Sequence, residues 1–317
     1  MQAEDIRNIS VIGAGLMGHG IAQIFASKNY NVHLLDVKSE LLSKALKDIR
    51  LNLSMMARKA VISKSVIDTI ISRIKTTTNM AEAVSDAQLV IEAVTENLEL
   101  KQEVFHDLDR LCPQETILAT NTSVISITEI AAKARRRERI LGTHFWNPPY
   151  IIPLVEVVKG RETSEEVVET IYQLLKNAGK HPVKVMKDIP GFVGNRLQHA
   201  LWREAISIVE NGIAEPATVD EVIKEGFGIR LPVLGPLENA DMVGLDLTLA
   251  VHDYILKYLN SSPSPSPLLR QKVAKGELGF KTGRGFYTWS AEEAQRSREH
   301  LLEYLLDRVR KEQNKTT

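Results

Sequence analysis

A histidine and a glutamate twelve positions apart are the residues best suited to acid–base chemistry in this chain. His144 ends one expected strand, and Glu156 lies in the next. An unperturbed imidazole titrates near about pH 6.5 and can accept a proton at neutral pH. If the two strands lie side by side, the carboxylate would fix the imidazole tautomer and stabilise its charged form. The alternative is a packed histidine before a turn. Because Asn147-Pro148 follows directly, catalysis is the favoured interpretation.

A glycine-rich segment, residues 11–20, follows an apolar strand and opens an amphipathic helix. Its glycines have the G-x-G-x-x-G spacing, which permits a tight turn, close approach of a pyrophosphate and close packing of helix on sheet. The helix N-terminus offers N–H groups to phosphates. The next strand ends in Asp36, whose carboxylate can accept both ribose hydroxyls and would repel a 2′-phosphate. The segment therefore predicts a site for NAD rather than NADP, with contacts from Gly13, Gly15, Leu16, Met17, Gly18 and Asp36.

Composition excludes several classes of protein. The 317 residues suffice for two domains, and 40 basic residues balance 40 acidic ones, which gives no support for a nucleic-acid partner. The N-terminus is charged, no apolar run is long enough to cross a bilayer, and Cys112 is the single cysteine. We therefore expect a cytoplasmic protein without a membrane partner, in which Cys112 is structural. No His or Cys pair has ligand spacing, so no metal site is expected.

The elements that position these residues alternate as a parallel sheet requires up to about residue 187. The pattern predicts an α/β fold with a Rossmann-type doubly wound sheet in residues 1–188. Residues 38–72 read as a helical hairpin projecting from the sheet, with a break near Val61. Further strands are expected at 73–77, 89–94, 116–120, 140–144, 154–158 and 183–186, and helices at 15–27, 98–111, 127–132 and 164–178.

From residue 189 the alternation ends, and residues 189–317 read as a smaller all-α domain for substrate binding and dimerisation. The expected helices are 195–211, 218–225, 241–259 and 291–311. An all-α unit with so many apolar helix faces often completes its core by dimerising, so we expect a homodimer through this domain.

Two polar residues lie where a ligand would bind. Ser123 follows an apolar strand at the carboxyl edge of the sheet, and its hydroxyl could donate to a substrate oxygen as that oxygen gains charge. The alternative role is a helix N-cap, although Thr122 or Ser126 could serve instead. Asn195 opens the first helix of the second domain, where it would either face a ligand or cap that helix.

Five motifs occur together and in order, and with them the chain resembles the 3-hydroxyacyl-CoA dehydrogenase family from residue 5 to about 290. The resemblance implies oxidation of a secondary alcohol by NAD, with His144 and Glu156 as the catalytic dyad. It implies contacts of Asn195 with the substrate oxygen, and of Glu96 and Lys101 near the nicotinamide-side ribose. A surface ion pair is the alternative for these last two. The motifs are Asn121-Thr-Ser123, His144-Phe-Trp-Asn-Pro148, Leu154-Val-Glu156, Pro190-Gly-Phe-Val-Gly-Asn195-Arg and Lys281-Thr-Gly-Arg-Gly-Phe-Tyr287.

The charge of the predicted hairpin is a clue to the class of substrate. Residues 38–73 contain eight basic and three acidic residues, which is a local excess of five positive charges in a chain that is neutral overall. The family's hairpin closes over coenzyme A, whose phosphates would favour such a field, and Ser54 and Lys59 are the expected contacts. Solvated helix faces are the alternative. Asn121 and Asn147 are further candidates, either as cofactor contacts or as supports of the dyad, and Asn147 also as a substrate contact.

Other residues favour a different substrate. Pro153 stands where family members acting on acyl-CoA usually have a lysine, and residues 228–236 resemble relatives that oxidise small free 3-hydroxy acids. These relatives include gulonate, carnitine and pyridine-carboxylate dehydrogenases. Arg230 could then hold a substrate carboxylate, or instead pair with Glu225 or Asp241. The leading prediction is an L-3-hydroxyacyl-CoA dehydrogenase; the alternatives are a free-acid dehydrogenase and a non-catalytic, crystallin-like protein.

The residues after Tyr287 extend beyond the usual end of the family. They carry an apolar stripe at helical spacing, which predicts a packing face against the second domain or a partner subunit. The stripe consists of Leu301, Leu302, Tyr304, Leu305 and Val309.

Overall fold

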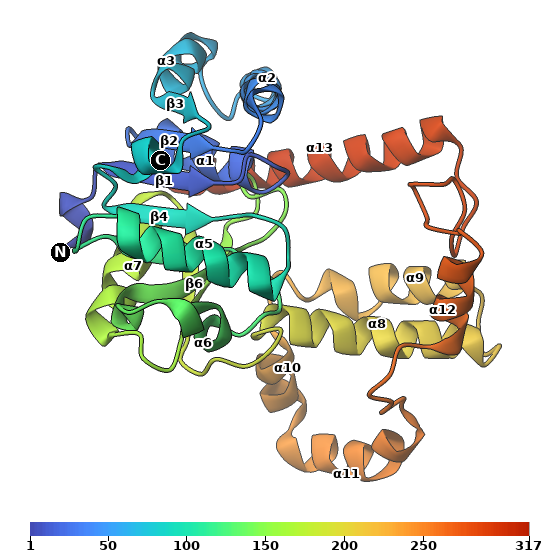
Figure 1. The fold of residues 1–317 in the computed structure, drawn as a ribbon. Helices are drawn as coiled ribbons and strands as arrows, with labels where there is room; N and C mark the ends of the chain where they lie inside the picture. The colour runs from blue at the N-terminus through green and yellow to red at the C-terminus, as the bar shows by residue number, and fades with distance from the viewer. Residues whose placement is uncertain (317) are drawn as a thin grey trace. The chain divides into compact units, whose positions relative to one another are not determined.

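The computed structural model describes the backbone of residues 1–316 and the side chains of residues 1–312. Within that range eight strands form one sheet in the order β3-β2-β1-β4-β5-β6-β7-β8. Figure 1 labels five of them and shows helices beside the sheet. Neighbouring strands are parallel except for β6 and β7, which are antiparallel. The strands are β1 (Asn8–Ile12), β2 (Asn31–Leu35), β3 (Ile74–Thr77), β4 (Leu89–Glu92), β5 (Ile117–Thr120), β6 (Ile140–Phe145), β7 (Leu154–Lys159) and β8 (His181–Val185).

Helices cover both faces of the sheet because successive strand residues point to opposite sides. In β1, Ile9 and Val11 join one apolar cluster, whereas Ile12 joins the other. The first cluster contains side chains of α1 (Gly18–Ser27), α2 (Ser39–Arg58), α3 (Ile67–Ser72) and α7 (Glu165–Asn177). The second contains side chains of α4 (Met80–Val84), α5 (Leu98–Leu111) and α6 (Ile127–Ile130). The predicted Rossmann-type doubly wound fold is confirmed.

The predicted helical hairpin is present, and its helices α2 and α3 pack on each other and on α1. α2 buries the stripe Leu42, Ala45, Ile49 and Leu53 in the cluster that also holds α1. The chain turns after α2 at Ala60, whose φ is +56°, and returns through α3. The basic residues of α2 therefore lie on the face away from this stripe.

The chain divides into two compact units, one of Met1–Asn195 with the residues from Leu301 onward, and one of Arg196–His300. This division differs from the expected boundary between residues 188 and 189. The start of α8 (Gly194–Glu210) stays with the first unit because amides there are bonded to β7, as described below. The end of α13 (Ala291–Thr316) stays there because Leu306 is buried against the hairpin. The expectation that the apolar stripe of this helix packs on the second domain or on a partner subunit is therefore wrong for Leu302, Leu305 and Val309, which pack with Leu306 on the hairpin of the first unit.

The second unit is helical in all its long elements, as expected. It holds most of α8 together with α9 (Pro216–Glu225), α10 (Pro236–Val243), α11 (Leu245–Ile255), α12 (Pro267–Ala274) and the start of α13. The single helix predicted over residues 241–259 is wrong. The helix is interrupted at Gly244, whose φ of +104° lies outside the helical region and favours glycine. In the first unit, α1 begins at Gly18 rather than at the predicted Gly15.

Candidate active site

The antiparallel pairing of β6 with β7 places His144 directly opposite Glu156. The Nδ1 atom of His144 is 2.7 Å from Oε2 of Glu156, and the two side chains are only 6% and 1% exposed. This register meets the condition under which the sequence predicted a pair. A carboxylate at Nδ1 fixes the ring tautomer and leaves Nε2 as the nitrogen for a substrate proton.

Glu156 is held by the backbone as well as by the histidine. Its Oε1 accepts the N–H groups of Val193 at 3.0 Å and Gly194 at 2.9 Å, where α8 begins. Burial alone would raise the pKa of Glu156, but the hydrogen bond from His144 and these two amides outweigh burial and hold the pKa below its usual range. The carboxylate therefore stays charged near neutral pH and can stabilise an imidazolium.

Aromatic rings enclose the histidine. The ring of His144 lies 5.3 Å from that of Trp146 and 5.7 Å from that of Phe192, between centroids. A Cβ at Gly194 would come within 2.4 Å of the Trp146 ring, so close packing at this point requires glycine. The neighbouring backbone is fixed by Asn121, whose Oδ1 accepts the N–H of Phe145 at 2.9 Å. Asn121 therefore supports the strand that carries His144.

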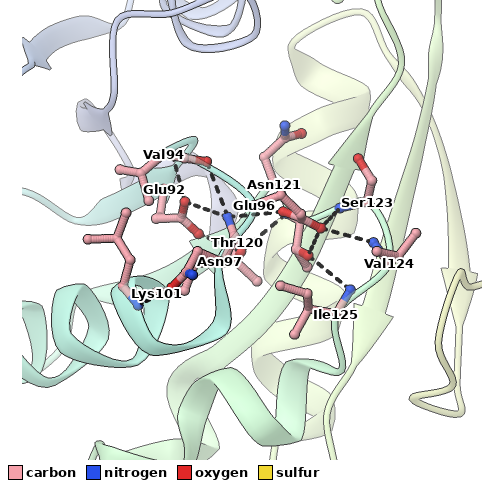
Figure 2. A network of polar contacts seen from close by, with 12 residues as sticks. Glu92, Val94, Glu96, Asn97, Lys101, Thr120, Asn121, Ser123, Val124 and Ile125 are labelled. Carbon is pink, nitrogen blue, oxygen red and sulfur yellow. Dashed lines mark hydrogen bonds and ion pairs between the residues drawn. The ribbon is translucent and has the colours of Figure 1, made fainter. Parts of the chain in front are cut away.

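A second polar network joins the ends of β4 and β5 to the start of α5, as Figure 2 shows. Glu96 accepts the Thr122 hydroxyl at 2.6 Å and the N–H groups of Ser123 and Val124 at 2.9 and 3.2 Å. Its other oxygen is 3.4 Å from Nζ of Lys101. Burial would raise the pKa of Glu96, but the Thr122 hydroxyl, the Lys101 ammonium and the two amides together lower it.

Glu92, which the sequence analysis did not single out, completes this network. Its Oε1 is 2.7 Å from Nζ of Lys101, and the two side chains are 0% and 1% exposed. Glu92 also accepts the Thr120 hydroxyl and the N–H of Val94, both at 2.6 Å. An acid at the end of the apolar run Leu-Val-Ile-Glu was the available signal, because a buried carboxylate requires partners. Lys101 is thus a buried ion-pair residue and not part of a surface pair.

The N-cap alternative for Ser123 does not hold. Ser126 caps α6 by accepting the N–H of Glu129, and Thr122 accepts the N–H of Ile125. Within the described side chains, the Ser123 hydroxyl makes no hydrogen bond, which leaves it available to a ligand. The backbone carbonyl of Ser123 accepts a hydrogen bond from Nδ2 of Asn195 at 2.8 Å, so these two candidate residues lie together. Asn195 lies within the first turn of α8, which begins at Gly194, so it is not an N-cap either.

The glycine-rich turn has the shape that a dinucleotide requires. A Cβ at Gly13, whose φ is +101°, would come within 2.6 Å of the Ala93 carbonyl, and one at Gly18 within 1.7 Å of the Gly13 carbonyl. A Cβ at Gly15 would meet nothing within 4 Å, so this backbone is open to an approaching phosphate. Asp36 lies beside the turn and accepts the N–H of Ala14 at 2.7 Å. These residues fit a dinucleotide.

Two further members of the predicted cofactor loop differ in exposure. Leu16 is 68% exposed, whereas Met17 is half-buried and packs against the core. Leu16 is therefore the one of the two that a bound dinucleotide could cover.

Among the described side chains of the first unit, those of Ser54, Lys59 and Asn147 make no hydrogen bond or ion pair with His144 or Glu156. The Ser54 hydroxyl donates to the Arg50 carbonyl within α2, and Lys59 is paired with Glu303 of α13. Asn147 is exposed beside the candidate site. Arg230 lies in the second unit, is exposed, and forms no ion pair with Glu225 or Asp241 in the described part of the chain.

Burial raises the pKa of the Cys112 thiol to about 12, which agrees with a structural role. Among the described residues, no cluster of three or more His, Cys, Asp or Glu side chains could hold a metal ion. No helix in the described range has the length and apolar character to cross a membrane.

Family models match nearly the whole chain. A model of the 3-hydroxyacyl-CoA dehydrogenase NAD binding domain matches residues 8–189, and one of the 3-hydroxyacyl-CoA dehydrogenase C-terminal domain matches residues 191–289. The first covers the glycine turn, His144 and Glu156, and the second ends just before α13.

Individual proteins match over similar lengths. The chain is 43% identical over 286 residues to a probable 3-hydroxybutyryl-CoA dehydrogenase of Bacillus subtilis, which covers 90% of this chain and 98% of that protein. It is 36% identical over 296 residues to the 5-formyl-3-hydroxy-2-methylpyridine 4-carboxylate 5-dehydrogenase of Mesorhizobium japonicum, over 91% and 92% of the two chains.

Solved structures of members of the same family resemble this chain over most of its length. The structure of a 5-formyl-3-hydroxy-2-methylpyridine 4-carboxylic acid 5-dehydrogenase, described as an NAD⁺-dependent dismutase, matches with a TM-score of 0.88 and 34% identity over 96% of this chain and 98% of that one. The (S)-3-hydroxybutyryl-CoA dehydrogenase of Ralstonia eutropha matches with a TM-score of 0.76 and 38% identity over 90% and 99%. The chain belongs to the 3-hydroxyacyl-CoA dehydrogenase family and is an NAD-dependent oxidoreductase.

Proposed function

We propose that this protein interconverts L-3-hydroxyacyl-CoA and 3-oxoacyl-CoA. The observation that carries the proposal is the buried hydrogen bond between His144 and Glu156, because it supplies an oriented base for a secondary alcohol. The match to a probable 3-hydroxybutyryl-CoA dehydrogenase over 98% of that protein's length supports the thioester as substrate.

In the direction of oxidation, Nε2 of His144 takes the hydroxyl proton, while Glu156 stabilises the imidazolium through Nδ1. The Ser123 hydroxyl and the Asn195 amide are the proposed contacts of the substrate oxygen as it loses that proton. NAD, when bound, supplies the acceptor for the hydride that leaves the alcohol carbon. In the reverse direction His144 returns its proton to the oxygen.

The chain's own residues divide the remaining tasks. The open backbone at Gly15 and the α1 N-terminus would hold the pyrophosphate, and Asp36 would accept ribose hydroxyls. Glu96 and Lys101 are proposed to lie near the second ribose, with Glu92 holding the lysine in place. The basic hairpin, through Ser54 and Lys59, is proposed to contact the phosphates of coenzyme A.

A second candidate function is oxidation of a small free hydroxy acid. The observation that favours it is the TM-score of 0.88 to the pyridine-carboxylate dehydrogenase, against 0.76 for the 3-hydroxybutyryl-CoA dehydrogenase. In this case Arg230, exposed and without an ion pair in the described range, would be the anchor for the substrate carboxylate.

We further propose that the protein is a cytoplasmic homodimer that pairs through its second unit. Apolar side chains of α10 and α11 support this proposal, because Leu237, Leu245 and Leu249 are 81%, 63% and 62% exposed. Patches of this kind mark interfaces in soluble proteins. The single cysteine, Cys112, fits a reducing compartment.

The substrate assignment is tested by following NADH oxidation with acetoacetyl-CoA and, separately, with acetoacetate and other free 3-oxo acids. We expect rapid turnover of the thioester and a kcat/KM at least about a hundredfold lower for acetoacetate, because the free acid lacks the contacts to the hairpin. Turnover of free acids alone would contradict the thioester function and favour the second candidate.

A further inference from the structure

The C-terminal helix α13 is docked on the hairpin through an apolar stripe. Leu306 is 1% exposed and forms a buried cluster with Val61 and Ile151. Partly buried side chains from the hairpin, the loop before β7 and α13 surround this cluster: Met55, Met56, Ile62, Tyr150, Leu302, Leu305 and Val309. Because these contacts fix the rotation of α13 about its axis, they also fix which of its polar residues face the hairpin.

Glu303 is the acid that this docking brings to the hairpin. Its Oε1 lies 3.1 Å from Nζ of Lys59, across 244 positions of sequence. The two side chains are 59% and 32% exposed, so solvent and dissolved anions reach the pair. The contact is therefore positioned by a buried apolar cluster but open to competition at the surface.

Lys59 differs from the other ion-paired basic residues of the hairpin in the origin of its acidic partner. Lys44 is paired with Asp48 and Arg50 with Asp68, so their acids belong to the hairpin itself. The partner of Lys59 comes instead from α13, which begins after the family's C-terminal domain ends at residue 289. One of the hairpin's excess positive charges is thus neutralised from outside the hairpin.

We infer that Glu303 is an intramolecular competitor for Lys59, which occupies the lysine that the phosphates of a coenzyme A thioester would otherwise bind. The inference rests on the proposed function, in which Lys59 is a coenzyme A contact. Glu303 weakens binding of phosphate-bearing substrates and leaves the reacting end untouched. It acts only through Lys59 and does not contact the substrate itself. Because exposed ion pairs are weak, removing this one strengthens binding about two- to fivefold.

The first test is Glu303→Gln, which keeps the length of the side chain and removes its charge. The KM for acetoacetyl-CoA falls about two- to fivefold, while kcat and the KM for NADH stay unchanged. Acetoacetyl-pantetheine, which carries the same reacting group without phosphates, shows no change in KM. The matched control is Glu299→Gln on the same helix, whose carboxylate accepts a hydrogen bond from Gln295. An unchanged KM for acetoacetyl-CoA, or an equal fall for the pantetheine thioester, overturns the inference.

A calorimetric titration with coenzyme A itself gives a readout independent of turnover. Glu303→Gln binds coenzyme A about two- to fivefold more tightly than the wild type, and this gain disappears when Lys59→Met is the background. A gain that persists without the lysine overturns the inference. If wild type and Glu303→Gln bind coenzyme A equally, only this inference fails. If neither binds it and only free 3-oxo acids are reduced, the thioester function fails as well.

Discussion

The two units of the chain differ in how many of their apolar side chains they bury. The first packs an apolar cluster on each face of its sheet and holds even charged site residues, such as Glu92 and Lys101, out of water. In the second, Val219 and Ala294 are the buried apolar side chains among residues 196–300, while Leu245 and Leu249 are more than half exposed. The candidate catalytic residues therefore belong to a unit with a well-buried core, whereas the second unit leaves many apolar side chains of its helices exposed.

The strongest test of the first half of this comparison is Lys101→Met. Methionine keeps much of the apolar stem but leaves the Glu92 carboxylate buried without its cation, at a cost of about 3–5 kcal/mol in the free energy of unfolding. Urea denaturation measures this change. The matched control is Lys133→Met, which removes an exposed pair with Glu103 and should leave the free energy of unfolding nearly unchanged. Equal losses in the two variants would show that the buried network does not stabilise the site.

The second half of the comparison is tested by Leu249→Glu on α11. A charge on an apolar interface weakens association by about 2 kcal/mol or more, so the variant dissociates at concentrations where the wild type is dimeric. Light scattering coupled to size exclusion measures the mass, which we expect to be about twice the chain mass of 35.4 kDa for the wild type. Leu51→Glu, an equally exposed leucine on α2 of the first unit, serves as the control and should leave the dimer intact. A monomeric wild type would contradict the proposed dimer.

Much of the first unit could be predicted because its signals are local. Alternating apolar residues indicate the strands, and the glycine spacing indicates the turn before α1. The loop of residues 146–153 returns the chain from β6 to the neighbouring β7 and brings His144 opposite Glu156. The break at Gly244 was also readable in principle, since glycine inside a helical pattern is a known signal for a helix end.

Contacts between distant segments could not be predicted. The apolar stripe of α13 predicts a packing face. No sequence pattern near the stripe indicates that it packs on the hairpin, which lies 240 or more positions earlier in the chain. Glu92 was recognisable only as an acid that requires a partner, and only the fold shows that the partner is Lys101. Long-range pairs of this kind depend on the whole arrangement of the sheet and not on sequence spacing.

The central claim is that the His144–Glu156 pair performs the proton transfer, and its most direct test is the turnover of acetoacetyl-CoA by His144→Ala and Glu156→Gln at saturating NADH. We expect kcat of His144→Ala to fall about 10²- to 10⁴-fold, because the oriented acid–base group is lost. Glu156→Gln falls in the same direction, since glutamine can accept from Nδ1 but carries no charge to stabilise an imidazolium. The Kd for NADH, measured by fluorescence titration, should stay unchanged in both variants. A wild-type kcat in His144→Ala would contradict the account.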